Sequence, residues 1–195
     1  MPVAPTAPAK DATAEFTYTF AGWDSEISAV TGDATYTAVF TSEKNSYTIT
    51  FVGENGDVLD TQTVEYGATP VAPTAPVKEN TDEYTYTFAG WTPAVEAVTG
   101  DATYTATYSA TKNAYTVTFN ANGGSAVATQ TIEYGAKVEE PTTSLDGWTC
   151  IGWFTADGKA WDFSTDVVTG NVELTAEWYD PSPDVDDGWN DQNGL

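Results

Sequence analysis

The segment PVAPTAPAKDATAEFTYTFAGW fills residues 2–23, and a near-copy, PVAPTAPVKENTDEYTYTFAGW, fills residues 70–91. The offset of 68 residues between them continues along the chain. It superimposes Trp23 on Trp91, Gly32 on Gly100, Tyr36 on Tyr104, Tyr47 on Tyr115, Phe51 on Phe119 and Tyr66-Gly67 on Tyr134-Gly135. Self-similarity at a fixed offset is the sequence signature of tandem repeats, so the chain is predicted to be a repeat array.

The third copy diverges after Tyr134. DGWTCIGW, at residues 146–153, stands where the second copy has YTYTFAGW, and NVELTAEW, at residues 171–178, stands where it has DATYTATY. Between these two segments lies an insertion, FTADGKAWDFSTDVV, which contains an Asp157-Gly158 turn signal. The third copy therefore keeps the order of the repeat but enlarges its second half.

Apolar and polar residues alternate within each copy. Tyr47, Ile49 and Phe51 alternate with threonines, and residues 84–88 and 104–108 show the same period of two. This period places apolar side chains on one face of a strand and polar side chains on the other. Two Asn-Gly pairs, at 55–56 and 122–123, predict hairpins, and the proline-rich segments 2–8 and 70–76 predict extended loops. The expected fold class is mainly β, with at most a helical turn at residues 164–168.

The landmarks divide the chain into four parts. We expect a partial repeat at 1–46, complete repeats at 47–113 and 114–179, and an acidic tail at 180–195. Short polar links, TSEKNS and SATKNA, are predicted to separate the repeats in an elongated array.

The partial repeat at residues 1–46 matches only the second half of a complete one. Its closing strand, residues 36–40, is expected to have an unpaired edge, and its apolar face should be uncovered. That face comprises Phe16, Tyr18, Phe20, Trp23, Tyr36 and Phe40. We expect this half-repeat to be the least stable part of the chain or to self-associate with another copy.

Charge excludes several classes of partner. The chain has 29 acidic residues, six lysines and no histidine, which gives a net charge of −23. No basic patch can form, so neither nucleic acid nor anionic lipid is an expected partner. No stretch is apolar enough to insert into a membrane, and neither a signal peptide nor an anchor is recognised. The single cysteine, Cys150, excludes an intramolecular disulfide.

The third copy resembles the Listeria–Bacteroides repeat, also called the internalin B-repeat. The resemblance rests on YTVTFNANGG at residues 115–124, Glu-Tyr-Gly at 133–135, Gly-Trp at 152–153, Trp-Asp-Phe at 161–163 and the closing Trp178. The first two copies lack Trp-Asp-Phe and end in Phe40 or Tyr108. The resemblance implies small β-grasp-like repeats in secreted or cell-wall-attached surface proteins of Gram-positive-type bacteria. It supplies no catalytic residues.

Neither catalysis nor cofactor binding is expected. Without histidine, the commonest acid–base side chain is missing. Glu139 and Glu140 are adjacent carboxylates but read as solvated surface beside Pro141. The aspartate-rich tail lacks the spacing of a calcium loop, so no metal site is expected. Cys150 aligns with the apolar face of its strand and is expected to be a small buried hydrophobe.

The tryptophans are the strongest candidates for ligand contact. Trp23, Trp91 and Trp153 recur at one repeat position and are expected to build the cores. Trp148 and Trp161 occur only in the third copy and are candidate ligand-stacking residues.

Three functional hypotheses remain. The leading one is a non-catalytic stalk or spacer in a bacterial surface protein, with a role in adhesion. Its alternative is a carbohydrate- or mucin-binding module that uses exposed aromatics, so a host or bacterial glycan or surface protein is the expected partner. The third is an accessory domain of a secreted enzyme.

Overall fold

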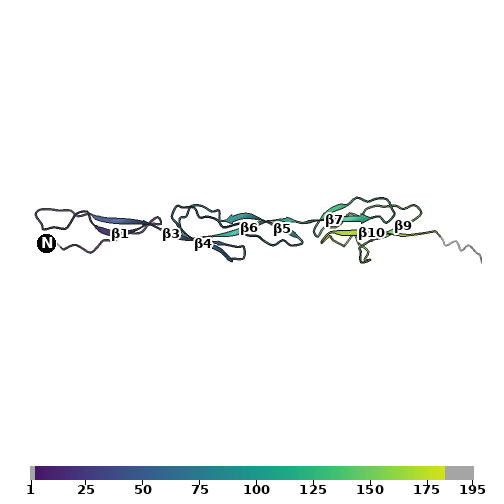
Figure 1. The fold of residues 1–195 in the computed structure, drawn as a ribbon, viewed down its shortest axis with the longest axis horizontal. Helices are drawn as coiled ribbons and strands as arrows, with labels where there is room; N and C mark the ends of the chain where they lie inside the picture. Colours follow the sequence, from purple (N-terminus) through teal and green to yellow (C-terminus); the bar gives the residue numbers. More distant parts are fainter. Residues whose placement is uncertain (1–2, 183–195) are drawn as a thin grey trace, which may run out of the picture. The chain divides into compact units, whose positions relative to one another are not determined.

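The computed structural model describes residues 3–182 and is mainly β. Its ten strands form three sheets, and no helix occurs within the described residues (Figure 1). The strands are β1 (Phe16–Trp23), β2 (Ala38–Lys44), β3 (Ser46–Val52), β4 (Val58–Glu65), β5 (Tyr84–Thr92), β6 (Ala102–Lys112), β7 (Ala114–Asn120), β8 (Gln130–Glu133), β9 (Thr149–Phe154) and β10 (Val172–Tyr179). The predicted fold class, mainly β with tandem repeats, is confirmed.

The second repeat forms a four-stranded sheet in the order β4-β3-β6-β5. β3 and β4 make the predicted antiparallel hairpin, which turns through Gly56 at a φ of 86°. β3 also pairs in parallel with β6, from Ile49 opposite Ala102 to Val52 opposite Thr105. The alternating side chains of β3 point into the core, where both Ile49 and Phe51 are 0% exposed.

The third repeat has the same topology. Its sheet follows the order β8-β7-β10-β9, and β7 pairs in parallel with β10. The buried core consists of Val117, Val138, Trp153, Val168, Leu174 and Ala176. Both sheets thus place a parallel pair at the centre and one further strand at each edge. The β-grasp assignment stays a prediction, since no helix packs on either sheet within residues 3–182.

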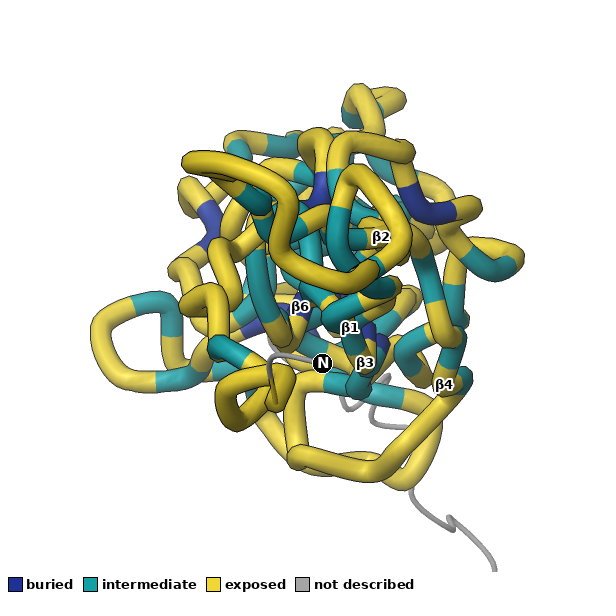
Figure 2. The backbone as a smooth tube through the Cα atoms, turned by 90° about the vertical axis from the view of Figure 1, so that its left-hand side faces the viewer, coloured by how far each residue is buried: buried dark blue, intermediate teal, exposed yellow. Residues whose placement is uncertain are grey.

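The half-repeat contains only β1 and β2, which pair antiparallel. A bulge at Gly22, whose φ is 141°, shifts their register. No residue in the described segment 3–46 is fully buried, and Figure 2 shows the backbone of β1 and β2 as half-buried or exposed. Two strands do not enclose a core, and the described half-repeat has no counterpart of the hairpin that adds two strands to the sheet of a complete repeat.

Two expectations about this region were wrong. The closing strand spans Ala38–Lys44 instead of residues 36–40. The polar links do not separate the repeats either, because most of their residues belong to strands. Only Asn45 lies between β2 and β3, and only Asn113 lies between β6 and β7. Alternating threonine and aromatic residues favour strand right up to the junction, so the polar composition of the links misled the prediction.

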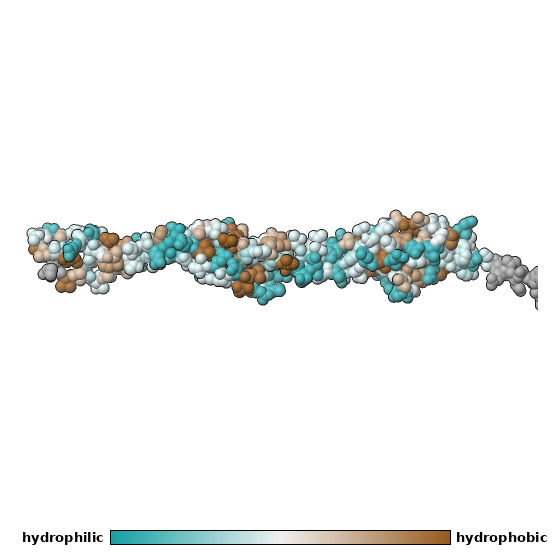
Figure 3. All heavy atoms as spheres, viewed as in Figure 1, coloured by the Kyte–Doolittle hydropathy of each residue, from teal (hydrophilic) through white to brown (hydrophobic). Residues whose placement is uncertain are grey.

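Contacts divide the chain into two compact units whose borders differ from the repeat borders. Within the described residues, one unit comprises residues 3–78 and 87–109, and the other comprises residues 79–86 and 110–182. A piece of the second repeat therefore belongs with the third. The four predicted domain boundaries stay predictions. On the face shown in Figure 3, hydrophobic residues gather in several separate patches among hydrophilic ones.

Candidate functional site

The Asn-Gly-Gly turn of the third repeat and its closing tryptophan form one structure. Asn122 and Gly123 both adopt positive φ, of 47° and 94°. The indole Nε1 of Trp178 donates a hydrogen bond to the carbonyl oxygen of Ala121 at 3.0 Å. The ring then lies over Gly124, where a Cβ would stand 2.4 Å from the Cζ2 atom of Trp178. Only glycine fits beneath this ring, which explains why the two motifs occur together.

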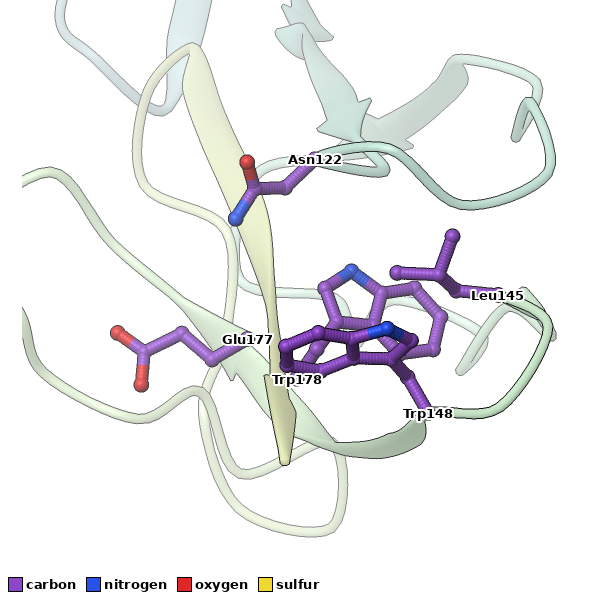
Figure 4. Close-up of a pocket in the computed structure, with 5 residues that line it drawn as sticks. All are labelled: Asn122, Leu145, Trp148, Glu177 and Trp178. Carbon is purple, nitrogen blue, oxygen red and sulfur yellow. The ribbon is translucent and has the colours of Figure 1, made fainter. Parts of the chain in front are cut away.

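An aromatic groove lies beside this turn. It has a volume of about 530 Å³ and is lined by Asn122, Leu145, Trp148, Glu177 and Trp178 (Figure 4). Trp148 occupies a tight turn closed by the bond from its own N–H to the carbonyl of Leu145, and it is 45% exposed. Figure 4 shows the Glu177 carboxylate directed away from the two indole rings, and the Asn122 amide donates to the Ala176 carbonyl at 3.1 Å. The groove therefore offers mainly indole surface, which suits a ligand with apolar faces.

The structure separates the two candidate stacking residues. Trp148 lines the aromatic groove, whereas Trp161 is half-buried and packs against the core of the third repeat. The backbone N–H of Trp161 donates to the carbonyl oxygen of Trp153 at 2.8 Å, which holds the Trp-Asp-Phe insertion on the sheet. The Nε1 atom of Trp161 is buried and has no hydrogen-bond partner. Trp161 also lines two neighbouring hollows of about 240 and 430 Å³, so ligand stacking stays a prediction for both tryptophans.

The recurring tryptophans differ in burial according to how complete their repeat is. Trp153 is 2% exposed and contacts Phe119, with ring centroids 5.1 Å apart. Trp91 is half-buried against the core of the second repeat. Trp23 is half-buried in the half-repeat, where no buried core exists in the described residues. Cys150 is a free, half-buried thiol packed against the core of the third repeat.

Two aspartates of the insertion loop, Asp162 and Asp166, are held by local hydrogen bonds. The hydroxyl of Ser164 and then its backbone N–H donate to Asp162 and lower the pKa of that carboxyl group below its ordinary value. The N–H of Asp162 donates in turn to Asp166, whose pKa is lowered by this bond and by Lys159. These bonds brace the insertion loop.

Metal-binding groups do not cluster in the described part of the chain. Within residues 3–182, no three acidic, cysteine or histidine side chains lie close enough together to hold a metal ion. Glu139 and Glu140 are both exposed. The aspartate-rich sequence considered for calcium begins at residue 183 and lies outside the described residues.

A second feature, which sequence reasoning missed, is a pair of junction clamps centred on Asn45 and Asn113. The side-chain amide of Asn113 donates to the carbonyls of Thr81 and Asp82, at 2.9 and 3.0 Å, and its Oδ1 accepts from the hydroxyl of Thr85 at 2.7 Å. Its backbone N–H donates to the Glu83 carbonyl, and its carbonyl accepts from the N–H of Tyr134.

The clamp at Asn45 repeats this pattern bond for bond. Its partners are Thr13, Ala14, Glu15, Thr17 and Tyr66. A tyrosine hydroxyl completes each clamp: Tyr47 donates to Ala14 at 2.6 Å and Tyr115 donates to Asp82 at 2.7 Å. The sequence did hold a signal, because asparagine is disfavoured inside strands and yet recurs here at the repeat offset.

Comparison with known proteins identifies the repeats. Residues 47–114 and 115–177 each match the family model of the Listeria-Bacteroides repeat domain. This chain belongs to the Listeria–Bacteroides repeat family. The resemblance seen in the third copy is confirmed, and the match extends to the second copy despite its lack of Trp-Asp-Phe.

Two relatives from Evansella cellulosilytica carry similar sequences. A "Putative membrane protein" is 33% identical over 182 residues, which cover 87% of this chain and 26% of the relative. A "Putative Gly-rich membrane protein" is 33% identical over 169 residues, which cover 80% of this chain and 18% of the relative. The chain thus spans about a quarter or less of these relatives. Among its own described residues, no helix has the length and apolarity needed to cross a membrane.

Proposed function

We propose that this Listeria–Bacteroides repeat chain is a non-catalytic spacer region of a secreted or cell-wall-attached bacterial surface protein. The junction clamps carry the proposal. A flexible linker leaves neighbouring repeats free to reorient, whereas here a single residue joins consecutive strands and its side chain bonds three groups of the preceding hairpin. We infer that such a junction limits how far one repeat can turn against the next, which is what a spacer requires.

Charge and family support the same function. A net charge of −23 makes neighbouring segments repel one another and keeps the array soluble. Listeria–Bacteroides repeats are typically non-catalytic, and both relatives are much longer than this chain and are named as membrane proteins. A repeat region that displays another part of a surface protein fits these facts.

The spread of distances across the second junction tests this proposal. Spin labels are attached at Val71→Cys and Val167→Cys, both exposed positions, in a Cys150→Ala background. We expect a narrow distance distribution that broadens when Asn113→Ala removes the clamp. Asn55→Ala, in the β3–β4 turn, is the matched control and should leave the width unchanged. An equally broad distribution with and without the clamp contradicts the spacer proposal.

The aromatic groove favours a second candidate function, the recognition of carbohydrate. Indole rings stack on the apolar faces of sugars, and Trp148 is 45% exposed in a groove that it lines together with Trp178. A glycan array probed with the whole chain tests this candidate. Binding should be lost in Trp148→Ala and kept in Ile151→Ala, which removes a side chain that is 56% exposed but lies outside the groove. An array without signal rejects it.

A further inference from the structure

Each complete repeat begins and ends on two strands that pair at the centre of its sheet. The third repeat starts with β7 and finishes with β10, and residues 117–120 lie opposite residues 172–175 in parallel. The second repeat pairs its first strand, β3, with its last strand, β6, in the same way. Because parallel strands run in one direction, the chain enters such a sheet at one end of this central ladder and leaves it at the other.

This topology decides how tension acts on a repeat. A pull on the chain before β7 and after β10 draws the two strands past each other, so the hydrogen bonds of the ladder are strained together. A pull on the same end of both strands would open these bonds one after another. One hydrogen bond adds little net stability, so bonds that are strained together resist a pull better than bonds that break in turn. The central ladder is named the shear ladder below.

The core blocks a gradual slip of β10 along β7. Leu174 and Ala176 are buried, whereas Glu173 and Glu177 between and beside them are exposed. A slip by one residue, about 3.3 Å, would bring the carboxylate of Glu173 to the buried position of Leu174. Burying an unpaired charge is costly, so the first step of a slip has no stable register. The shear ladder therefore holds or fails as one unit.

The third repeat adds two side-chain bonds beyond the last pair of the shear ladder. The indole Nε1 of Trp178 donates to the Ala121 carbonyl at 3.0 Å, and the side-chain amide of Asn122 donates to the Ala176 carbonyl at 3.1 Å. Both bonds, named the closing bonds below, join the segment just after β7 to β10. The pull that strains the shear ladder therefore strains the closing bonds as well.

The second repeat closes differently. The hydroxyl of its closing aromatic residue, Tyr108, donates to the Pro76 carbonyl at 3.3 Å, in the loop before β5. β5 lies at the edge of the sheet, so this bond does not join the two strands that tension draws past each other. The third repeat should therefore resist a greater force than the second.

We propose that the complete repeats carry tension along the chain, with the shear ladder as the element that resists it and the closing bonds as its reinforcement in the third repeat. The proposal rests on the spacer function, because the spacer of an attached surface protein is pulled when the part that it displays is held. It gives the Asn-Gly-Gly turn and the closing tryptophan of the third repeat a common mechanical role.

Pulling one repeat in two directions tests the proposal. The full chain carries pairs of cysteine handles in a Cys150→Ala background and is stretched in a single-molecule force experiment. Ala114→Cys with Tyr179→Cys pulls on opposite ends of the shear ladder, whereas Ala114→Cys with Thr169→Cys pulls on the same end of both strands. All three handle positions are exposed.

Forced unfolding is governed by the unfolding rate, so at equal loading rate we expect a force at least about twofold higher for the handles at 114 and 179. The chain length released identifies the event, since residues 114–179 span roughly 220–240 Å when extended, before the folded span is subtracted. Equal forces in the two directions overturn the proposal.

Trp178→Phe tests the closing bonds, because it removes the indole donor and keeps an aromatic ring. It should lower the force between residues 114 and 179 and leave the force between 114 and 169 unchanged, since a pull on that end breaks the near end of the shear ladder first. Val138→Ala, which weakens the buried core outside both strands, is the matched control and should lower both forces. An equal fall in both directions for Trp178→Phe, or no fall, contradicts the reinforcement.

Failure of this proposal is distinct from failure of the spacer function. Both handle pairs lie within the third repeat and do not span the junction at Asn113. Equal forces in the two directions, together with a narrow distance distribution across that junction, reject the tension proposal alone. A distribution that is equally broad with and without the junction clamp, together with forces that differ by direction, rejects the spacer function alone.

Discussion

Gly124→Ala should destabilise the third repeat specifically. A Cβ atom at residue 124 would lie 2.4 Å from Cζ2 and 3.0 Å from Cη2 of Trp178, and 2.8 Å from Oγ1 of Thr143. Contacts under 3.0 Å require something to move. The obstacle is a rigid indole that is anchored by its hydrogen bond to Ala121, so the ring cannot give way without losing that bond.

The size of the effect follows from two contributions. Forcing an extra methyl group into a packed site costs about 1–3 kcal/mol. Loss of the indole hydrogen bond adds about 0.5–1.5 kcal/mol. We therefore expect the free energy of opening of the third repeat to fall by about 1.5–4.5 kcal/mol. The second repeat, whose closing aromatic residue is Tyr108, should keep its stability.

Hydrogen exchange measured repeat by repeat is the appropriate assay, because the chain contains more than one cooperative unit. Amides of residues 115–178 should exchange faster in Gly124→Ala, while residues 47–108 serve as an internal reference. Gly170→Ala is the matched control, since its Cβ would meet no atom within 4 Å and its φ lies outside the left-handed region. If Gly124→Ala left exchange in residues 115–178 unchanged, the packing of Trp178 over this turn would be refuted.

Three further predictions concern pH, calcium and the half-repeat. The pKa of Asp162 is lowered, so its hydrogen bonds stabilise the insertion loop at pH above the ordinary carboxyl pKa of 3.8, and this stabilisation is lost as the pH falls through the pKa of the folded state. Carboxyl NMR should show that Asp162 titrates below pH 3.8, and Ser164→Ala should move its titration midpoint up. An unshifted midpoint in the wild-type chain contradicts this. Millimolar calcium should raise the melting temperature no more than sodium chloride of equal ionic strength, because the acidic groups of residues 3–182 do not cluster into a metal site. A calcium-specific rise of many degrees would contradict this and indicate bound metal. Amides of residues 3–46 should exchange faster than those of residues 115–178, because none of the former residues is fully buried; equal protection would require an unrecognised core.

The sequence predicted the strands well because the apolar residues that alternate along each strand are the ones that face the core. The pattern of Tyr47, Ile49 and Phe51 identified both the strand and its buried face, and the Asn-Gly pair placed the hairpin turn. The parallel pairing of β3 with β6 joins residues more than fifty positions apart. Local alternation carries no signal for this pairing, and the sequence analysis did not predict it.

The sequence was a poorer guide to the junctions and the groove. Lys44-Asn45 and Lys112-Asn113 are polar and look like linker, whereas the bonds of the two asparagines depend on the loops before β1 and β5, about thirty residues earlier. Trp148 and Trp161 both occur only in the third copy, so the sequence does not distinguish their roles. Only the three-dimensional packing shows that Trp148 lies in an open turn and that Trp161 lies against the core.

Small-angle X-ray scattering of the whole chain tests the central claim, that clamped junctions make these repeats a spacer. A compact globule of 195 residues would have a radius of gyration of about 16 Å. We predict a value well above this, together with a distance distribution that has a long tail, and little change between low and moderate salt. A radius near 16 Å, or one that shrinks towards it when salt screens the charges, would contradict the account.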